Sequence, residues 1–290
     1  MNNKILIIGA NGMLGGSLLR YLSKEATLEV LGTVRSLEAE KLLSCQGYSN
    51  TIREVDIIDF HTLRSVVMKF KPAYVLNCVG VIKQLEQSKA PVPSIEINSL
   101  FPHRIAKVCD EVGARLIHFS TDCVFSGIKG MYVESDIPDA TDLYGRSKLL
   151  GEVDYGKHLT LRTSIIGHEL GKAVSLVDWF LRQKGSVNGY RNAVFSGMPT
   201  VYVAEFLQKY VFGFDVFGLY HLGVDSIDKY SLLKLIGEHY EVSTDILPYD
   251  DFKIDRSLNS ERLNSVTNFV PPSWDTLIQR MRREYLEYFA

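Results

Sequence analysis

The sequence predicts an α/β fold: a doubly wound parallel sheet, followed by a smaller, mainly C-terminal lobe. Over the first half of the chain, short apolar runs of strand length alternate with amphipathic runs of helical spacing. Strands that are separated by crossover helices must be parallel, with right-handed connections. After Ser164 glycines interrupt the periodic pattern, which predicts a separate lobe.

The first expected strand, Lys4 to Ile8, is a continuous apolar run typical of a strand buried on both faces. An amphipathic run from Met13 to Leu22 predicts the helix that follows it. We expect further strands at 28–34, 51–55, 74–78, 115–119 and 159–163, and helices at 37–43, 59–70, 94–112 and 143–155. In the second half we expect helices at 176–183, from Pro199-Thr200 onward, at 228–239 and at 273–288, and a strand at 218–222 that returns to the sheet.

Composition limits the class of protein. The chain has 290 residues, of which 46% are hydrophobic and 23% charged, so it can bury a large core in one sizeable domain or two small ones. A net charge of −2 gives no general attraction to nucleic acid or to an acidic membrane. The longest apolar runs have the length of short strands, and only four apolar residues follow Lys4 before the first glycine, so we expect no signal peptide and no membrane span.

Cysteine and histidine usage also limits the chemistry. The four cysteines form no C-x-x-C pair, which predicts reduced thiols in a cytoplasmic protein. The seven histidines form no H-E-x-x-H or comparable cluster, so we expect no catalytic metal.

A glycine pattern follows the first expected strand, with glycines at Gly9, Gly12 and Gly15. In this spacing the first glycine allows a tight turn, the second lets the backbone approach a diphosphate, and the third lets the helix pack close to the strand. The helix start offers N–H groups and positive potential to phosphates. The pattern therefore predicts a dinucleotide site at Gly9, Asn11, Gly12, Met13, Leu14 and Gly15. An ordinary glycine-rich turn is the alternative.

Polar or small residues end the next three strands, where ligands of such sheets bind. Arg35 stands where an acidic residue usually binds a cofactor that lacks a 2′-phosphate. A cation at this position favours NADP(H), with NAD(H) as the alternative cofactor. The alternative role for Arg35 is that of a surface arginine. The third strand ends in Asp56-Ile57, suited to an adenine edge. The fourth ends in Cys78-Val79-Gly80, which are small enough to lie beside a ribose. The predicted dinucleotide-binding Rossmann domain covers 1–166, with a return strand and helix near 200–230, and the predicted substrate-binding lobe covers 167–199 and 231–290.

The expected catalytic residues are Thr121, Tyr144 and Lys148. Tyr144 and Lys148 are four residues apart and so share one helix face. An ammonium beside a phenol lowers the phenol pKa, so the tyrosine can give a proton to a carbonyl oxygen that a threonine hydroxyl also binds. The same spacing recurs in Tyr230/Lys234 and Tyr249/Lys253, but those pairs do not follow a strand that ends in hydroxyl residues, and we expect them on the surface.

Four segments together resemble the extended short-chain dehydrogenase/reductases, and among these the dTDP-4-dehydrorhamnose reductase family. They are the glycine pattern, Ser120-Thr121-Asp122-x-Val124-Phe125, Tyr144-x-x-x-Lys148 and Leu161-Arg162-Thr163-Ser164. The resemblance implies NADPH-dependent reduction of a 4-keto-6-deoxy sugar nucleotide for polysaccharide precursor biosynthesis. It also implies that Lys148 and Ser164 contact the cofactor and that Asn98 supports the lysine. The implied partner is a nucleotide sugar, and a homodimer is left open.

The sequence departs from that family around the sugar pocket. Cys123 and Ile165 stand where the family usually has Tyr and Trp in its substrate pocket. Lys83 and Gln84, in a loop of different sequence, are expected to contact the sugar or the diphosphate, with an exposed loop as the alternative. By resemblance, Arg256 is a diphosphate ligand, with a surface salt bridge as the alternative. The cofactor and the chemistry are therefore expected to be retained, while the sugar is not identified.

Two other functions stay open. One is an epimerase or dehydratase of the same superfamily. Dehydratases read Thr-Asp-Glu, however, and here Cys123 replaces the basic Glu. The other is a non-catalytic NADP-binding subunit, because the regulatory subunit of methionine adenosyltransferase resembles the same reductases.

Overall fold

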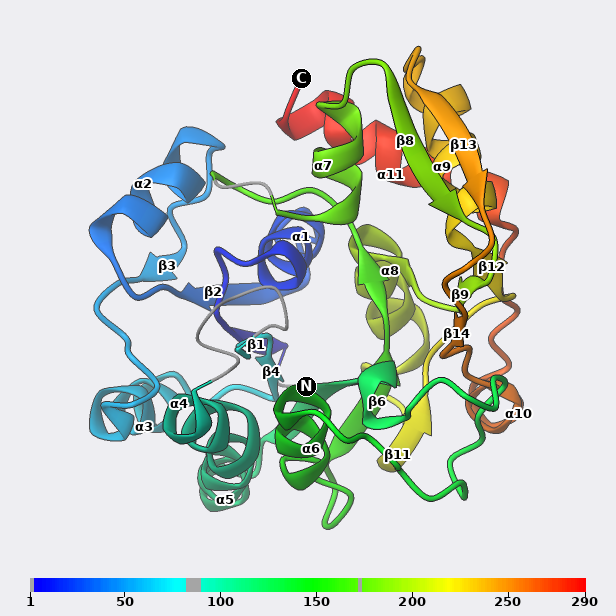
Figure 1. The fold of residues 1–290 in the computed structure, drawn as a ribbon. Helices are drawn as coiled ribbons and strands as arrows, with labels where there is room; N and C mark the ends of the chain where they lie inside the picture. The colour runs from blue at the N-terminus through cyan, green and yellow to red at the C-terminus, as the bar shows by residue number, and fades with distance from the viewer. Residues whose placement is uncertain (1–2, 82–89, 172–173) are drawn as a thin grey trace. The chain divides into compact units, whose positions relative to one another are not determined.

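The computed structural model describes residues 3–81, 90–171 and 174–290. The chain divides into two compact units, each of which is assembled from separate stretches of sequence (Figure 1). The first unit comprises Met1–Thr121, Thr141–Leu161 and Phe214–Leu219, and the second comprises Asp122–Ala140, Arg162–Gly213 and Tyr220–Ala290. The functions predicted for domains 1–166, 167–199 and 231–290 stay predictions.

A seven-stranded sheet runs in the order β11-β6-β5-β4-β1-β2-β3. The pairs β1–β2, β1–β4, β2–β3 and β4–β5 are parallel. The order reverses next to β1, as in doubly wound dinucleotide-binding sheets, so the predicted fold class is confirmed. The strands are β1 (Lys4–Ile8), β2 (Glu29–Thr33), β3 (Thr51–Ile52), β4 (Tyr74–Asn77), β5 (Arg115–Thr121), β6 (Leu159–Thr163) and β11 (Gly218–His221).

Helices cover both faces of this sheet, with α1 and α2 on one face and α3 to α6 on the other (Figure 1). They are α1 (Met13–Leu22), α2 (Leu37–Cys45), α3 (Phe60–Phe70), α4 (Pro91–Ser94), the π-helix η2 (Ile95–Leu100), α5 (Phe101–Val112) and α6 (Leu143–Leu150). Leu6, Val75 and Leu116 of the sheet are fully buried against Val67 of α3 and Ile105 of α5. Burying each such side chain contributes about 1.5–3 kcal/mol, so the sheet and these helices form one core.

Two predicted helices differ from the structure. The helix expected at 94–112 is not a single α-helix, because it contains η2 and because Pro102, at the start of α5, has no N–H to continue the hydrogen-bond ladder. The helix expected at 143–155 ends at Leu150. A side chain at the next residue, Gly151, would collide with the carbonyl oxygen of Asn98, so this end of α6 packs directly on the η2 backbone.

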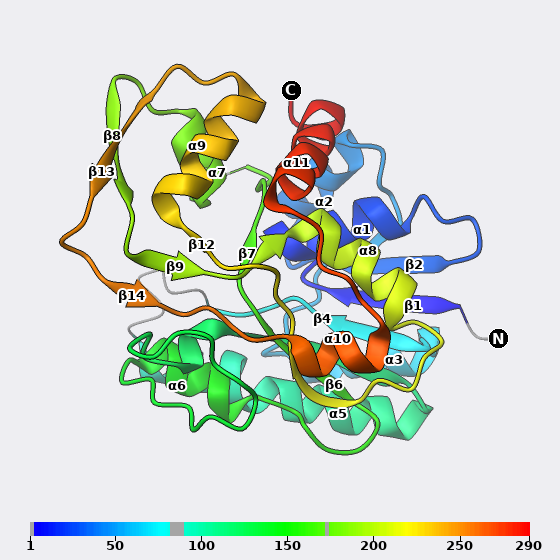
Figure 2. The same ribbon diagram turned by 90° about the vertical axis from the view of Figure 1, so that its right-hand side faces the viewer.

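The second unit contains short strands in three small sheets and most of the remaining helices (Figure 2). The pairs are β7 (Ile165–Ile166) with β10 (Met198–Pro199), β8 (Ser186–Tyr190) with β13 (Asp245–Tyr249), and β9 (Ala193–Phe195) with both β12 (Ile227–Asp228) and β14 (Ile254–Asp255). The helices are the 3-10 helix η3 (Asp122–Val124), α7 (Leu176–Leu181), α8 (Thr200–Tyr210), α9 (Lys229–Tyr240), α10 (Glu261–Thr267) and α11 (Trp274–Tyr288).

Two kinds of feature are absent from the part of the chain that the structure describes. No helix in the described ranges is long and apolar enough to cross a membrane. No group of three or more His, Cys, Asp or Glu residues in those ranges is placed to hold a metal ion.

Candidate functional site

The turn between β1 and α1 consists of glycines and main-chain hydrogen bonds. Gly9 has a φ of 82°, which favours glycine, and the N–H of Gly12 donates to the Gly9 carbonyl oxygen at 3.2 Å. A Cβ at Gly15 would collide with that same oxygen, so only glycine lets α1 approach the turn this closely. The N-cap residue Gly12 offers no side-chain cap, and the first turn of α1 has no acidic residue. The helix start is therefore a positive end that suits a phosphate.

Arg35 and Asp56 follow the two strands beyond β1. Arg35 is exposed two residues beyond the end of β2, and among the described residues no carboxylate forms an ion pair with it. Asp56 and Ile57 are half-buried beyond β3, and the Asp56 carboxylate accepts a hydrogen bond from the Ile58 N–H at 3.0 Å. An unpaired guanidinium at this strand end can take a phosphate in a bidentate contact.

The end of β4 is held by a buried amide. Asn77 Nδ2 lies 3.0 Å from His118 Nδ1, and Asn77 Oδ1 accepts from the Val79 N–H at 3.2 Å. Burial lowers the pKa of His118 well below its ordinary value, with the Lys148 charge acting in the same direction, so the ring is neutral. Burial also raises the pKa of the Cys78 thiol, which therefore stays protonated. The segment Cys78-Val79-Gly80 is thus fixed beside β1.

Asn98 lies in the π-helix η2, and its side chain is 1% exposed. Its Oδ1 accepts from the Val81 N–H at 2.8 Å, and its Nδ2 donates to the Val81 carbonyl oxygen and to Ser147 Oγ, both at 3.1 Å. A Cβ added to Gly80 would lie 3.3 Å from Asn98 Oδ1 and 4.0 Å from Lys148 Nζ. Asn98 therefore ties the segment after β4 to α6, close to the predicted catalytic lysine.

Lys148 is buried, with 5% of its surface exposed. Its Nζ donates to the carbonyl oxygen of Phe119 in β5 at 2.7 Å. Burial lowers the lysine pKa to about 8, and the Glu152 carboxylate opposes that shift. Glu152 also accepts a hydrogen bond from Ser120 Oγ at 2.7 Å. Helix α6 is thus joined to the end of β5 by a buried ammonium that can lose its proton near neutral pH.

The other two predicted catalytic residues lie in the same unit. Thr121 is the buried last residue of β5, and Tyr144 is half-buried in the first turn of α6. The Asp142 carboxylate caps this helix by accepting from the Gly145 N–H at 2.8 Å. The other two Tyr-x-x-x-Lys pairs of the sequence lie elsewhere. Tyr230 and Lys234 lie on α9, with Lys234 exposed, and Tyr249 lies in strand β13.

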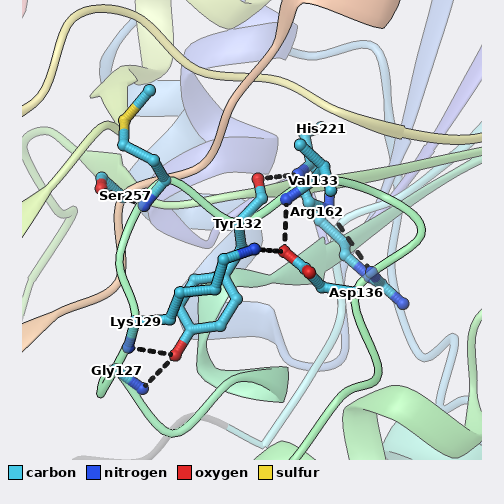
Figure 3. A network of polar contacts seen from close by, with 9 residues as sticks. Gly127, Lys129, Tyr132, Val133, Asp136, Arg162, His221 and Ser257 are labelled. Carbon is cyan, nitrogen blue, oxygen red and sulfur yellow. Dashed lines mark hydrogen bonds and ion pairs between the residues drawn. The ribbon is translucent and has the colours of Figure 1, made fainter.

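In the second unit, the segment 122–140 is held by a buried polar network around Tyr132 (Figure 3). The Tyr132 hydroxyl accepts from the N–H groups of Gly127 and Lys129, both at 3.1 Å, and its ring stacks on Phe125 with centroids 4.1 Å apart. The Tyr132 carbonyl oxygen lies 3.0 Å from His221 Nδ1. This network fixes the segment that contains Cys123.

The tautomer of His221 follows from its other contact. Arg162 Nη1 lies 3.4 Å from His221 Nε2, and because arginine can only donate, Nε2 accepts and Nδ1 carries the proton. Burial lowers the pKa of His221 to about 4, with Glu134 opposing the shift and Arg162 adding to it. The imidazole is therefore neutral, as its two contacts require.

The predicted substrate residues have different placements. Cys123 in η3 and Ile165 in β7 are both half-buried in the second unit. Arg256, just after β14, donates from Nε to the Phe125 carbonyl oxygen at 2.9 Å. Ser164, predicted to contact the cofactor, accepts a hydrogen bond on its carbonyl oxygen from the Met198 N–H at 3.0 Å. Lys83 and Gln84 lie outside the described residues.

One functional candidate was missed from the sequence. Lys229, the first residue of α9, places its ammonium 3.5 Å from the centroid of the Phe195 ring. The available signal was a lysine in the first turn of a helix, where the positive helix end disfavours a cation. Nothing in the sequence indicated that Phe195 would lie beneath it.

Residues 3–286 match the family described as the RmlD substrate binding domain. The Probable low-salt glycan biosynthesis reductase Agl14 of Haloferax volcanii is 33% identical over 147 residues, which are 50% of this chain and 46% of that protein. The methionine adenosyltransferase 2 subunit beta of Xenopus laevis is 31% identical over 152 residues, which are 52% of this chain and 42% of that protein. The chain thus spans about half the length of the curated relatives it matches.

A solved structure extends the likeness of the fold to nearly the whole chain. The crystal structure of dTDP-4-dehydrorhamnose reductase from Bacillus anthracis str. Ames, in complex with NADP, superposes with a TM-score of 0.80. The identity is 22%, and the match covers 97% of this chain and 99% of that chain. At this identity the comparison shows a shared fold.

Proposed function

The chain belongs to the RmlD substrate binding domain family, and from that premise we propose that it is an NADPH-dependent oxidoreductase. The proposed substrate is a 4-keto-6-deoxy sugar attached to a nucleoside diphosphate, reduced in the making of a polysaccharide precursor. The observation that carries this proposal is the buried Lys148 ammonium bound to the end of β5, in the same unit as Thr121 and Tyr144. Burial of a charged lysine is costly, and a buried lysine with a lowered pKa is typical of catalytic sites.

The first unit fits a dinucleotide. The Gly9 to Gly15 turn leaves room for a diphosphate beside an uncapped helix start. Arg35, which has no ion-pair partner in the described part of the chain, suits a 2′-phosphate, and this favours NADP(H) over NAD(H). Asp56 and Ile57 would border the adenine, and Cys78 to Gly80 the ribose. When bound, the nicotinamide supplies the hydride.

The protein's own groups then supply the proton and the positioning. Tyr144 donates a proton to the carbonyl oxygen as that oxygen gains charge, and Thr121 donates a hydrogen bond to the same atom. Lys148, when charged, favours the phenolate that remains on Tyr144 and holds the ribose hydroxyls. Asn98 keeps the Val81 backbone and α6 in register around that lysine.

The second unit supplies the proposed sugar and diphosphate contacts. Cys123 and Ile165 border the sugar, and Arg256 binds the diphosphate with the guanidinium nitrogens that do not hold Phe125. Since Cys123 and Ile165 differ from the residues usual among the rhamnose enzymes, we expect dTDP-4-dehydrorhamnose to be a poor substrate. A cytoplasmic location is part of the proposal, because all four cysteines are free.

A second candidate is a non-catalytic NADP-binding subunit. The identity of 31% to the methionine adenosyltransferase subunit over half of this chain supports it. The test is NADPH oxidation screened over a panel of 4-keto sugar nucleotides with different bases and sugars. Turnover of a panel member supports the reductase. Tight NADPH binding without turnover of any member contradicts it and supports the binding subunit.

A further inference from the structure

The hydroxyl of Ser147 lies in α6 between the predicted catalytic residues Tyr144 and Lys148. The Ser147 side chain is 1% exposed. Its Oγ donates to the Tyr144 carbonyl oxygen at 2.9 Å and accepts from Asn98 Nδ2 at 3.1 Å. A hydroxyl has one proton, and because the amide nitrogen of Asn98 only donates, that proton is directed to Tyr144. The direction of both hydrogen bonds is therefore fixed.

The main chain of Ser147 is held by a second side chain of the same π-helix. Ser99, which is 7% exposed, donates from Oγ to the Ser147 carbonyl oxygen at 2.8 Å. Asn98 and Ser99 are neighbours in η2, so two consecutive residues bind one residue of α6, at its hydroxyl and at its carbonyl. Both hydrogen bonds are buried, which keeps water from competing for these groups.

Helices α6 and η2 are also close at the level of the main chain. A Cβ at Gly151, just beyond α6, would collide with the Asn98 carbonyl oxygen. The Asn98 side chain is itself held by the N–H and the carbonyl oxygen of Val81. Helix α6 therefore has little freedom to slide or rotate against η2.

The Tyr144 carbonyl oxygen connects the two predicted catalytic residues. In an α-helix this oxygen also accepts from the N–H four residues further on, which in α6 belongs to Lys148. A serine hydroxyl that bonds to the preceding turn of its own helix is by itself a local feature. Here the hydroxyl is also bound from η2, so the position of η2 is transmitted to the turn that carries Tyr144 and Lys148. The Lys148 ammonium is fixed in turn on the Phe119 carbonyl oxygen.

We propose that Ser147 is a positioning residue, which sets the spacing between the Tyr144 phenol and the Lys148 ammonium for proton transfer. It acts through the main chain of Tyr144, and the inference rests on the proposed function. The attraction between an ammonium and a phenolate weakens with distance, so a displaced first turn of α6 makes it more costly to leave a phenolate on Tyr144. Misplacing a reacting group by about 1 Å can cost about 10²-fold in rate.

The test begins with Ser147→Ala, which removes the hydroxyl. With the best substrate of the 4-keto panel, kcat should fall by about 10-fold or more, while KM and the Kd for NADPH stay within about twofold. The solvent deuterium isotope effect on kcat should increase, because proton transfer from Tyr144 then limits the rate more strongly. Ser147→Thr keeps the hydroxyl and should recover part of the lost rate.

The matched control is Ser99→Ala, which removes a buried serine hydroxyl that also joins η2 to α6 but does not bind Tyr144. Thermal unfolding should show similar losses of stability in Ser99→Ala and Ser147→Ala, whereas kcat should fall only in Ser147→Ala. Ser147→Cys, which has a weaker donor of similar size, replaces the Ala variant if the latter does not fold.

A double variant separates positioning from general structural support. If Ser147 acts through the Tyr144 acid, Ser147→Ala should leave kcat almost unchanged in a Tyr144→Phe background, because the acid is already absent. A further loss of about 10-fold in that background would overturn the inference and leave the reductase intact. Unchanged kcat in a folded Ser147→Ala variant, or equal losses in Ser99→Ala and Ser147→Ala, would do the same. Absence of turnover in wild type would overturn the proposed function and the inference with it.

Discussion

Lys148 and Phe119 are joined by a hydrogen bond of 2.7 Å from the buried ammonium to a main-chain carbonyl oxygen. Helix α6 is thereby fixed to β5 two residues before Thr121. A buried cation is stabilised here by one carbonyl and by the charge of Glu152, which explains both its retained charge and its lowered pKa.

The alkaline side of the activity profile tests this arrangement. Lys148 has a pKa of about 8 and is needed charged, so kcat/KM should fall as the pH rises through 8. Glu152 raises the pKa of Lys148, whereas His118, whose own pKa the Lys148 charge lowers, is neutral in this range. Lys148→Arg should move the alkaline fall upward, because the guanidinium does not lose its proton.

Lys229 also has a pKa of about 8 and provides the control. Lys229→Met should keep the alkaline fall of kcat at saturating substrate. If the alkaline fall in activity vanishes in Lys229→Met but persists unchanged in Lys148→Arg, it is caused by deprotonation of Lys229 and not of Lys148.

Arg35 should determine the choice of cofactor. Arg35→Asp removes the cation expected to hold a 2′-phosphate and introduces a carboxylate that repels it. The Kd for NADPH should rise about 10-fold or more, while the Kd for NADH should change little or fall. Fluorescence titration of both cofactors measures this. Equal affinities in wild type, unaltered by the substitution, would make Arg35 a surface residue only.

Asn98 should support stability and cofactor binding together. Asn98→Ala leaves the Val81 N–H and carbonyl without their buried partner, at about 1–3 kcal/mol for each unsatisfied group. We expect the free energy of unfolding in urea to fall by about 2–4 kcal/mol and the NADPH affinity to fall with it. Asn50→Ala is the matched control, since Asn50 bridges Ser23 and Val30 away from the predicted catalytic residues. It should lower stability while sparing the affinity for NADPH in the folded protein.

His221 should make the protein sensitive to acid. Its folded pKa of about 4 lies below the unfolded value of about 6.5, so the unfolded state binds more protons between these values. The stability is fully present above pH 6.5 and is lost as the pH falls toward 4, with up to about 1.4 kcal/mol per pH unit from this residue. His221→Gln keeps an acceptor for Arg162 and should flatten the pH dependence of urea unfolding between pH 6.5 and 4.5. An unchanged slope would show that His221 is not the titrating group.

The sheet was predictable because its signals are local. Each signal depends only on adjacent residues: the apolar runs predict β1, β4, β5 and β6, and the glycines predict the turn after β1. All of these elements are confirmed. The short strands β9, β12 and β14 were missed because two or three residues are too few to show a period of two. Their pairing is set by contacts between distant parts of the chain.

The same limit applies to the candidate site. The spacing of the motifs singled out Thr121, Tyr144 and Lys148 as the catalytic residues, and their catalytic roles stay predictions. The hydrogen bonds of Asn98 to Val81 depend on a π-helix that propensity does not indicate. The position of Lys229 over Phe195 could not be predicted from the sequence, since it follows the pairing of β12 with β9, which are distant in the chain.

Thr121 and Tyr144 should contribute unequally to the rate. Thr121→Val removes one hydrogen bond to the carbonyl oxygen but leaves the acid in place, so kcat should fall less than in Tyr144→Phe. Steady-state kinetics with NADPH and the best substrate of the 4-keto panel compares the two. A larger loss in Thr121→Val than in Tyr144→Phe would reverse the assigned roles.

The most direct test of the proposed reductase is the rate of NADPH oxidation by Tyr144→Phe with that substrate, beside wild type and Tyr230→Phe. Tyr144→Phe removes the proposed acid and keeps the ring, so kcat should fall by about 10²–10⁴-fold while the Kd for NADPH stays nearly unchanged. Tyr230→Phe, from the second Tyr-x-x-x-Lys pair, should react like wild type. Reduction of the 4-keto sugar by Tyr144→Phe at the wild-type rate would contradict the proposed mechanism.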